Sequence, residues 1–361
     1  MFAFDIDDEL EILIEVTRKL AAEKLLPTLR EAEQHRAVDD SVREAFVEVG
    51  LAGLEIPESL GGAGLGSLSR VCLNEELAAA DAGAALALDP LGPALYPVLE
   101  LGGESALAEL QAVCEARPGS RAVLLCEAED RDTAEGLSLE AEWVPADDVA
   151  AVVALGPEGC CWATDGIATE PVRGAGLRAA GASRLVVDGA RLRGAWRDPQ
   201  GASRAWARTR LYVASLQLGV MRAACEFSRA YAQEREAFGR PIAHHQALAF
   251  LIIDMNMALE GARLLVREAA WRADRGLPVS GEAAAALVEC IEAARFIGPN
   301  GVQILGGHGF VQDYPVEKHM REARALGLLA GGLDLAVQEA GLHLCDREQP
   351  LALAHLASGG E

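Results

Sequence analysis

From about residue 206 nearly to the C-terminus, the chain repeats apolar residues at helical spacing. In "HHQALAFLIIDMNMALEGARLLVREA" the apolar positions recur at three- and four-residue steps, the period of one face of an α-helix. This pattern predicts a long helix whose apolar stripe packs into a core or against another subunit. The stripe consists of Leu248, Leu251, Ile252, Met255, Leu259 and Val266.

The spacing of apolar residues changes twice along the chain. The stretch "ELEILIEVTRKLAAEKLLPTLREAEQ" and its neighbours have the helical period, whereas "RAVLLCEA", "DDVAAVVAL", "GCCWATDG" and "SRLVVDGARL" are short apolar runs between Gly, Pro and Asp. We therefore expect an α+β protein that is mainly α. The predicted domains are an N-terminal helical domain (1–118), a small central β-barrel-like domain (119–205) and a C-terminal helical bundle (206–361).

Charge and hydropathy exclude several classes of protein. About half of the residues (51%) are hydrophobic, but no stretch of roughly eighteen residues is free of charge, so we expect no membrane-spanning helix. The N-terminus is acidic and lacks the positive region and apolar run of a secretory signal, which favours a cytoplasmic protein. The net charge of -23 argues against a nucleic acid partner, because binding phosphates requires clustered Lys and Arg.

Neither cysteine nor histidine shows metal-ligand spacing. The eight cysteines are scattered without a CxxC pair, which is typical of buried thiols in a reducing compartment. His244 and His245 are adjacent, so they cannot form an i, i+4 pair on one helix face. We predict no metal site.

Two long motifs carry a resemblance to a known family. They are "REAFGRPIAHHQ" (235–246) and "QILGGHGFVQDYPVEKHMREAR" (303–324), and "EVGLAGLEIPESLGGAGLG", "NEELAAADAG" and "GLRAAGASRLVVDGARL" precede them in the expected order. With these motifs the chain resembles the acyl-CoA dehydrogenase family over nearly its whole length. The resemblance implies a C-terminal four-helix bundle, FAD as cofactor, and oxidation of an acyl-CoA thioester with an electron-transfer protein as acceptor.

The resemblance also implies a set of cofactor-binding residues. In the family, these positions reach across a dimer interface to the pyrophosphate and adenosine of an FAD held mainly by the neighbouring chain. The physical chemistry suits this role, because an Arg fork pairs with pyrophosphate, a Phe offers a flat face to adenine, and Gly lets the backbone approach phosphates. The positions in this chain are Arg235, Phe238, Gln246, Gln303, Gly306 and Gly307.

The family's catalytic base is missing. Counting from "MREAR", the usual Glu position falls on Ala330, and the alternative position used by some relatives falls near Thr209; neither side chain can take a proton. General-base catalysis typically contributes about 10²- to 10⁴-fold, so this loss would remove most of the proton-transfer chemistry. Five other carboxylates remain as substitutes, although surface or ion-paired roles are commoner for such residues: Glu127, Glu226, Glu317, Glu322 and Asp334.

The central domain also lacks sequence segments that are usual in the family. The family's "TEPxxGSD" and "WITN"-like segments hold the flavin ring, whereas this chain has "LCEAEDRDTAEG" and "EWVPADDVAA". Trp143 is either the counterpart of the flavin-contacting Trp or a packed structural residue. The positions that serve a neighbour's FAD are thus retained, while those that hold the ring, thioester and base in the same chain are lost.

Three hypotheses follow from this pattern. The preferred one is a non-catalytic subunit of a heteromeric α2β2 acyl-CoA dehydrogenase, whose related partner chain supplies the Glu and the contacts to the flavin ring. The second is a homo-oligomeric flavoenzyme with a displaced base. The third is a scaffold subunit without flavin.

Overall fold

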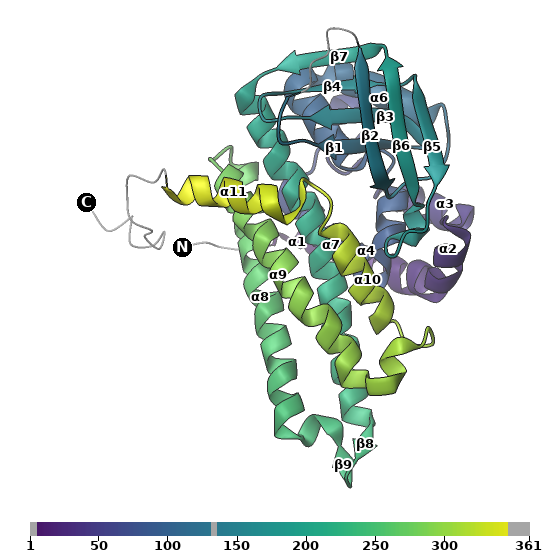
Figure 1. Cartoon of the computed structure of the whole chain (residues 1–361), viewed down its shortest axis with the longest axis vertical. Coiled ribbons are helices and arrows are strands. Elements are labelled where there is room, and N and C mark those ends of the chain that lie inside the picture. The colour runs from purple at the N-terminus through teal and green to yellow at the C-terminus, as the bar shows by residue number, and fades with distance from the viewer. Residues whose placement is uncertain (1–5, 131–135, 346–361) are drawn as a thin grey trace, which may run out of the picture.

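The computed structural model describes residues 6–130 and 136–345. The chain is mainly helical, with a small β region on one side of a long helical bundle (Figure 1). The helices are α1 (Asp8–Leu20), α2 (Leu29–His35), α3 (Asp40–Glu48), α4 (Ser67–Leu88), α5 (Leu95–Pro97), α6 (Gly103–Glu115), α7 (Pro199–Glu234), α8 (Gln246–Asp274), α9 (Ser280–Leu305), α10 (Val316–Leu326) and α11 (Gly332–Cys345). The strands are β1 (Arg121–Cys126), β2 (Leu137–Val144), β3 (Val149–Leu155), β4 (Gly159–Ala163), β5 (Ile167–Pro171), β6 (Ser183–Ala190), β7 (Leu192–Arg197), β8 (Glu236–Ala237) and β9 (Arg240–Pro241).

The β region consists of two sheets with orders β1-β3-β4-β7 and β2-β6-β5. β1 and β3 are parallel, and every other pair in the two sheets is antiparallel. All seven residues of β3 are buried, which explains its continuous apolar sequence "VAAVVAL". The four predicted strand segments coincide with β1, β3, β4 and β6, whereas the half-exposed β2, β5 and β7 had no distinct apolar run to predict them.

The long helix α7 connects the two halves of the molecule. It begins at Pro199 because the Asp198 side chain accepts a hydrogen bond from the Gln200 N–H and proline suits the first helical position. The helical region therefore starts before residue 206, which is the start that the change of apolar period predicted. The first half of α7 is buried on nearly all sides, between α4 and α9.

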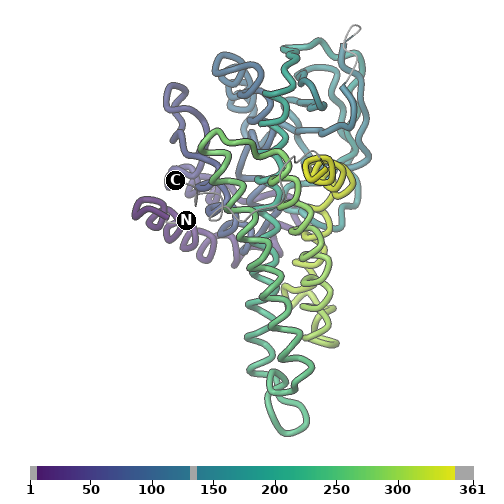
Figure 2. The backbone as a smooth tube through the Cα atoms, turned by 90° about the vertical axis from the view of Figure 1, so that its left-hand side faces the viewer, coloured from purple at the N-terminus to yellow at the C-terminus, as the bar shows by residue number. Residues whose placement is uncertain are grey.

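The bundle formed by α7, α8, α9 and α10 projects beyond the rest of the molecule, and the β8–β9 hairpin lies at its free end (Figures 1 and 2). The predicted stripe of α8 faces the core, since Met255, Leu259 and Val266 are buried. The opposite face of α8 is also apolar but is exposed, with Phe250, Ile253, Met257, Leu264 and Leu265.

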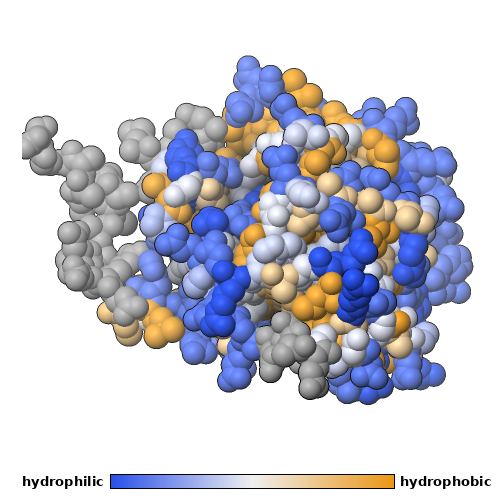
Figure 3. All heavy atoms as spheres, turned by 90° about the horizontal axis from the view of Figure 1, so that it is seen from above, coloured by the Kyte–Doolittle hydropathy of each residue, from blue (hydrophilic) through white to orange (hydrophobic). Residues whose placement is uncertain are grey.

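Figure 3 shows the end of the molecule opposite the bundle tip. There hydrophobic residues are interspersed with hydrophilic ones (Figure 3).

Across the described residues, no single helix is long and apolar enough to span a membrane; the bent pair Ser67–Leu88 and Gly92–Glu115 passes that test jointly, with a 56° bend.

Candidate functional site

The two motifs meet at the free end of the bundle. The first begins where α7 ends: the Arg235 N–H donates to the Tyr231 carbonyl over 2.9 Å, and the Arg235 carbonyl accepts from the Ile242 N–H over 2.8 Å. This pairing closes the loop that carries β8 and β9. His245 then supports the loop through a 3.1 Å contact between its Nε2 and the Ala237 carbonyl. The second motif follows α9 as a short 3₁₀ helix, Gly306–Phe310.

The six predicted cofactor residues all lie on this surface. Arg235, Gln246, Gln303, Gly306 and Gly307 are exposed, and Phe238 is 97% exposed. A Cβ added at Gly306 or Gly307 would meet no atom within 4 Å, so the backbone there is open to an approaching molecule. The chain's own core does not use these side chains, and they are available to a neighbouring chain.

Phe238 has an unusual backbone conformation. Its φ is +54°, in the left-handed region that a bulky residue rarely adopts, and its ring is in an edge-to-face arrangement with His245 at a centroid distance of 6.0 Å. Strain of this kind is concentrated at functional sites, where the local fold enforces it. Here the tight β8–β9 turn holds an aromatic ring out in solvent.

An aromatic cluster that was not predicted from the sequence joins the two motifs. His308 stacks on Tyr314 (centroid distance 5.1 Å, interplanar angle 7°), and the Tyr231 hydroxyl is 2.8 Å from His308 Nδ1. Tyr231 therefore contacts both loops, through its hydroxyl and its carbonyl. Aromatic residues are only 5% of the chain, so their concentration around the two motifs is a signal that could have identified the cluster.

Neither expected base position holds a group that can accept a proton. Ala330 is buried in the loop between α10 and α11 with a φ of +54°. A Cβ at the adjacent Gly331 would lie 3.0 Å from the ring of Trp206, one helical turn before Thr209 on α7. Trp206 is held by a 2.9 Å hydrogen bond to the Gly156 carbonyl. The Trp206 indole and the Leu335 side chain therefore lie against Gly331, next to Ala330 in the sequence. Thr209 is buried with no hydrogen-bond partner for its hydroxyl among the described residues.

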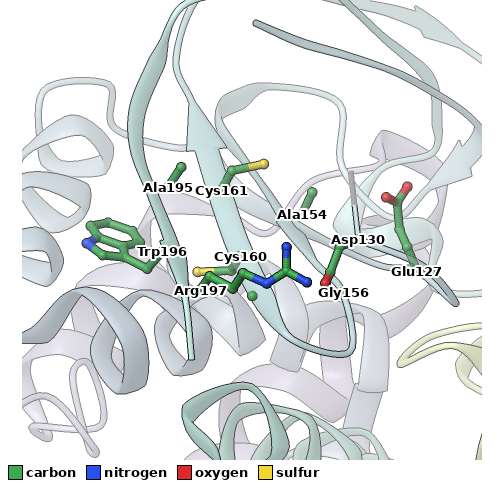
Figure 4. A pocket seen from close by; sticks show the side chains of 10 residues that line it. Glu127, Asp130, Ala154, Gly156, Cys160, Cys161, Ala195, Trp196 and Arg197 are labelled. Atoms are coloured by element: carbon green, nitrogen blue, oxygen red, sulfur yellow. The ribbon is translucent and has the colours of Figure 1, made fainter. Parts of the chain in front are cut away.

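Two small cavities lie on either side of Glu127, one within the β region and one between the β region and helices α7 and α11. One, of about 210 Å³, is lined by Cys160, Cys161 and Trp196 among others (Figure 4). The other, of about 260 Å³, is lined by Trp206 and Arg210. Both are smaller than the roughly 300–1,000 Å³ typical of sites for drug-sized ligands, and burial raises the pKa of the Cys160 thiol to about 12. Neither of these two cavities reaches the size typical of such a site, whereas a pocket of about 670 Å³ lies elsewhere and is lined by Ser67, Gln200 and Asp274 among others.

The five carboxylates that could replace the missing base differ from one another in their surroundings. Glu226 and Asp334 are exposed, and Glu317 forms ion pairs with Arg30 and Arg321. Glu322 is buried in an ion pair with Lys318, which also bonds to Asp81 over 3.0 Å. Glu127 is half-buried at the wall shared by the two cavities.

Trp143 lies in β2 and is half-buried against the main core. Its Nε1 is buried without a hydrogen-bond partner among the described residues, and a Cβ at Gly174 would lie 3.2 Å from that atom. The indole is thus packed against the chain itself. Part of the segment that replaces "TEPxxGSD", residues 131–135, lies outside the described residues.

Comparisons with known proteins agree with this fold. The acyl-CoA dehydrogenase N-terminal domain family matches residues 7–109, and the acyl-CoA dehydrogenase C-terminal domain family matches residues 201–339. Benzylmalonyl-CoA dehydrogenase of Aromatoleum aromaticum is 28% identical over 91% of this chain and 96% of its own length. The mitochondrial short-chain specific acyl-CoA dehydrogenase of Bos taurus is 43% identical, but over only 34% of this chain and 30% of that protein.

Solved structures show the same architecture. Butyryl-CoA dehydrogenase from Megasphaera elsdenii superimposes with a TM-score of 0.81 at 22% identity, covering 95% of this chain and 100% of that one. A chain of the ChsE4-ChsE5 complex from Mycobacterium tuberculosis superimposes with a TM-score of 0.77 at 21% identity, covering 97% and 100%. Members of the matched family bind FAD. Both family domains in their expected order, with the fold that joins them, show that this chain belongs to the acyl-CoA dehydrogenase family.

Proposed function

We propose that this chain is the non-catalytic subunit of a heteromeric acyl-CoA dehydrogenase. One observation carries the proposal: the surface that would serve a neighbour's FAD is intact and exposed, whereas both base positions hold side chains that cannot accept a proton.

In this proposal, Arg235, Gln303, Gly306 and Gly307 bind the pyrophosphate of FAD, and Phe238 lies against the adenine. FAD supplies the hydride acceptor for oxidation of an acyl-CoA thioester, and the partner chain supplies the Glu that takes the α-proton. The residues of this chain bind and orient the cofactor. An electron-transfer protein as the electron acceptor and an α2β2 assembly remain part of the proposal.

The exposed face of α8 supports association of the chain. Phe250, Ile253, Met257 and Leu264 follow one another at three-, four- and seven-residue steps and lie on one side of the helix, which begins at Gln246. A contiguous exposed apolar face of this kind is typical of a protein interface. It leads directly from the cofactor-binding loop, so a chain docked on it would lie beside Arg235. The ChsE4-ChsE5 complex shows that a heteromer occurs among proteins of this fold.

Replacing Arg235 tests the proposal. The chain would be co-expressed with a related acyl-CoA dehydrogenase chain that carries the Glu base, and FAD binding by the stripped complex would be measured by flavin fluorescence. We expect Arg235→Ala to weaken binding by about 30-fold, since it removes a charge-assisted hydrogen bond worth roughly 2 kcal/mol. Arg204→Ala, which removes an exposed Arg at the opposite end of α7, is the matched control. FAD binding unchanged by Arg235→Ala would contradict the proposal.

A further inference from the structure

His308 has an arrangement that none of the predicted cofactor contacts requires. It follows Gly306 and Gly307 directly, and its side chain is exposed at the end of the bundle. Its ring stacks on Tyr314, and Tyr231 packs edge-on against the ring at 5.9 Å. The Tyr314 carbonyl in turn accepts from Arg30 Nη2 over 3.0 Å. An exposed side chain is thus held in one orientation from two sides.

The hydrogen bond to Tyr231 determines which ring nitrogen of His308 is available. A phenol is the better donor and a neutral imidazole nitrogen the better acceptor, so the Tyr231 hydroxyl donates to Nδ1 over 2.8 Å. The proton of the neutral ring is then on Nε2. If the ring is protonated, Nδ1–H donates to the Tyr231 oxygen and Nε2 still carries a proton. In both charge states, Nε2 presents an N–H donor.

That donor is left for a ligand. Within the described residues, Nε2 of His308 has no hydrogen-bond partner. Tyr231 links it to Arg235, because the Tyr231 carbonyl accepts from the Arg235 N–H while its hydroxyl bonds His308. An oriented imidazole N–H and an Arg side chain are therefore offered at the ends of α9 and α7, beside a backbone that two glycines leave open. Such a set of donors is suited to a phosphate group.

We propose that His308 is a further phosphate-binding residue of this surface, donating through Nε2 to the pyrophosphate of the FAD held with the partner chain, and that Tyr231 positions it. This inference rests on the proposed function, since it concerns the same cofactor. It adds a phosphate contact that Arg235, Gln303 and the two glycines do not provide. Tyr231 is a positioning residue, which acts by fixing the tautomer and the ring orientation.

The test uses the stripped complex of the two chains, titrated with FAD. His308→Phe keeps an aromatic ring on Tyr314 but removes the donor, and we expect FAD to bind about tenfold more weakly, as for one lost hydrogen bond to a charged group. His308→Gln can place an amide N–H near the position of Nε2, and its FAD affinity should stay within about threefold of the wild type. Tyr231→Phe should fall between the two. A merely structural role of His308 predicts instead that both His308 variants lower the thermal unfolding midpoint and weaken FAD binding equally.

The outcomes separate this inference from the proposed function. If Arg235→Ala weakens FAD binding and His308→Phe does not, the His308 contact is wrong and the trans site stands. If neither variant weakens binding, both are wrong. Loss with His308→Phe, rescue with His308→Gln and an unchanged unfolding midpoint would support His308 as a phosphate contact.

Discussion

At the scale of single residues, the surface proposed to bind FAD holds backbone strain that the folded chain does not need. Phe238 has a φ of +54° and an almost fully exposed ring, so it contributes little burial to offset its conformation. A left-handed conformation costs a residue with a Cβ about 1–2 kcal/mol. The proposed contact with adenine gives this strain a function.

Replacing Phe238 by Gly should therefore separate stability from function. We expect Phe238→Gly to raise the free energy of unfolding of the isolated chain by about 1 kcal/mol, because Gly adopts positive φ without cost. FAD binding by the complex should fall, because the aromatic face is lost. Chemical denaturation and FAD titration measure the two effects.

Phe250→Gly is the control for this substitution. Phe250 is also an exposed aromatic residue, but its backbone is helical, so its replacement should destabilise the isolated chain by about 1 kcal/mol. A loss of stability with Phe238→Gly similar to that with Phe250→Gly would show that no strain is relieved.

At the scale of elements, α10 carries charged groups into the core. Lys318 and Glu322 form a buried ion pair to which Asp81, at the kink of α4, adds a second carboxylate. One ammonium thus faces two carboxylates. Burial raises the pKa of Glu322 to about 7; the Lys318 charge opposes this rise and the Asp81 charge adds to it.

The raised pKa of Glu322 predicts how stability depends on pH. Because the folded-state pKa lies above the ordinary value of 4.5, the protonated form of Glu322 is favoured in the folded chain. The stability that this raised pKa gives the folded chain is fully present below pH 4.5 and is lost as the pH rises through about 7. Glu322→Gln has no such loss, so its free energy of unfolding relative to the wild type should rise by about 2 kcal/mol between pH 5 and pH 8. Urea denaturation at the two pH values measures this.

The control is Glu226→Gln, which removes an exposed carboxylate of α7. A difference between Glu322→Gln and the wild type that stayed constant from pH 5 to pH 8, as in the control, would contradict the raised pKa of Glu322.

The exposed face of α8 gives a second prediction at this scale. Met257→Glu places a charge in the middle of the exposed face of α8. We expect it to dissociate the complex while changing the stability of the isolated chain by less than about 0.5 kcal/mol. Size-exclusion chromatography with light scattering measures the assembly. Ile12→Glu, at an exposed apolar position of α1, should leave the assembly intact. An assembly equally insensitive to Met257→Glu would show that α8 is not the interface.

At the scale of the whole molecule, periodicity and motif order were sufficient to predict the architecture. The helical stripe of α8, the apolar strands and the order of the motifs predicted the mainly α fold with a small β region. The start of α7 was placed too late, because the Asp198–Pro199 cap precedes the apolar period that was used to find the helix.

The site was predicted only in part, for physical reasons. Arg235 and the glycines belong to a continuous motif, so their position along the chain identifies them. Tyr231 and His308 are 77 residues apart and meet only when α7 and α9 pack side by side. Likewise, the indole that packs against Gly331 is that of Trp206, whose hydrogen bond to the Gly156 carbonyl depends on tertiary packing.

The bundle tip thus offers a flavin an open, exposed set of donors, whereas the two cavities beside Glu127 are small. The most direct test is flavin absorbance of the chain purified alone and of the chain co-expressed with a related chain that carries the Glu base. We predict almost no FAD on the chain alone and one FAD per pair of unlike chains in the complex. One FAD per subunit on the isolated chain would contradict the account, and so would a complex that contains no flavin.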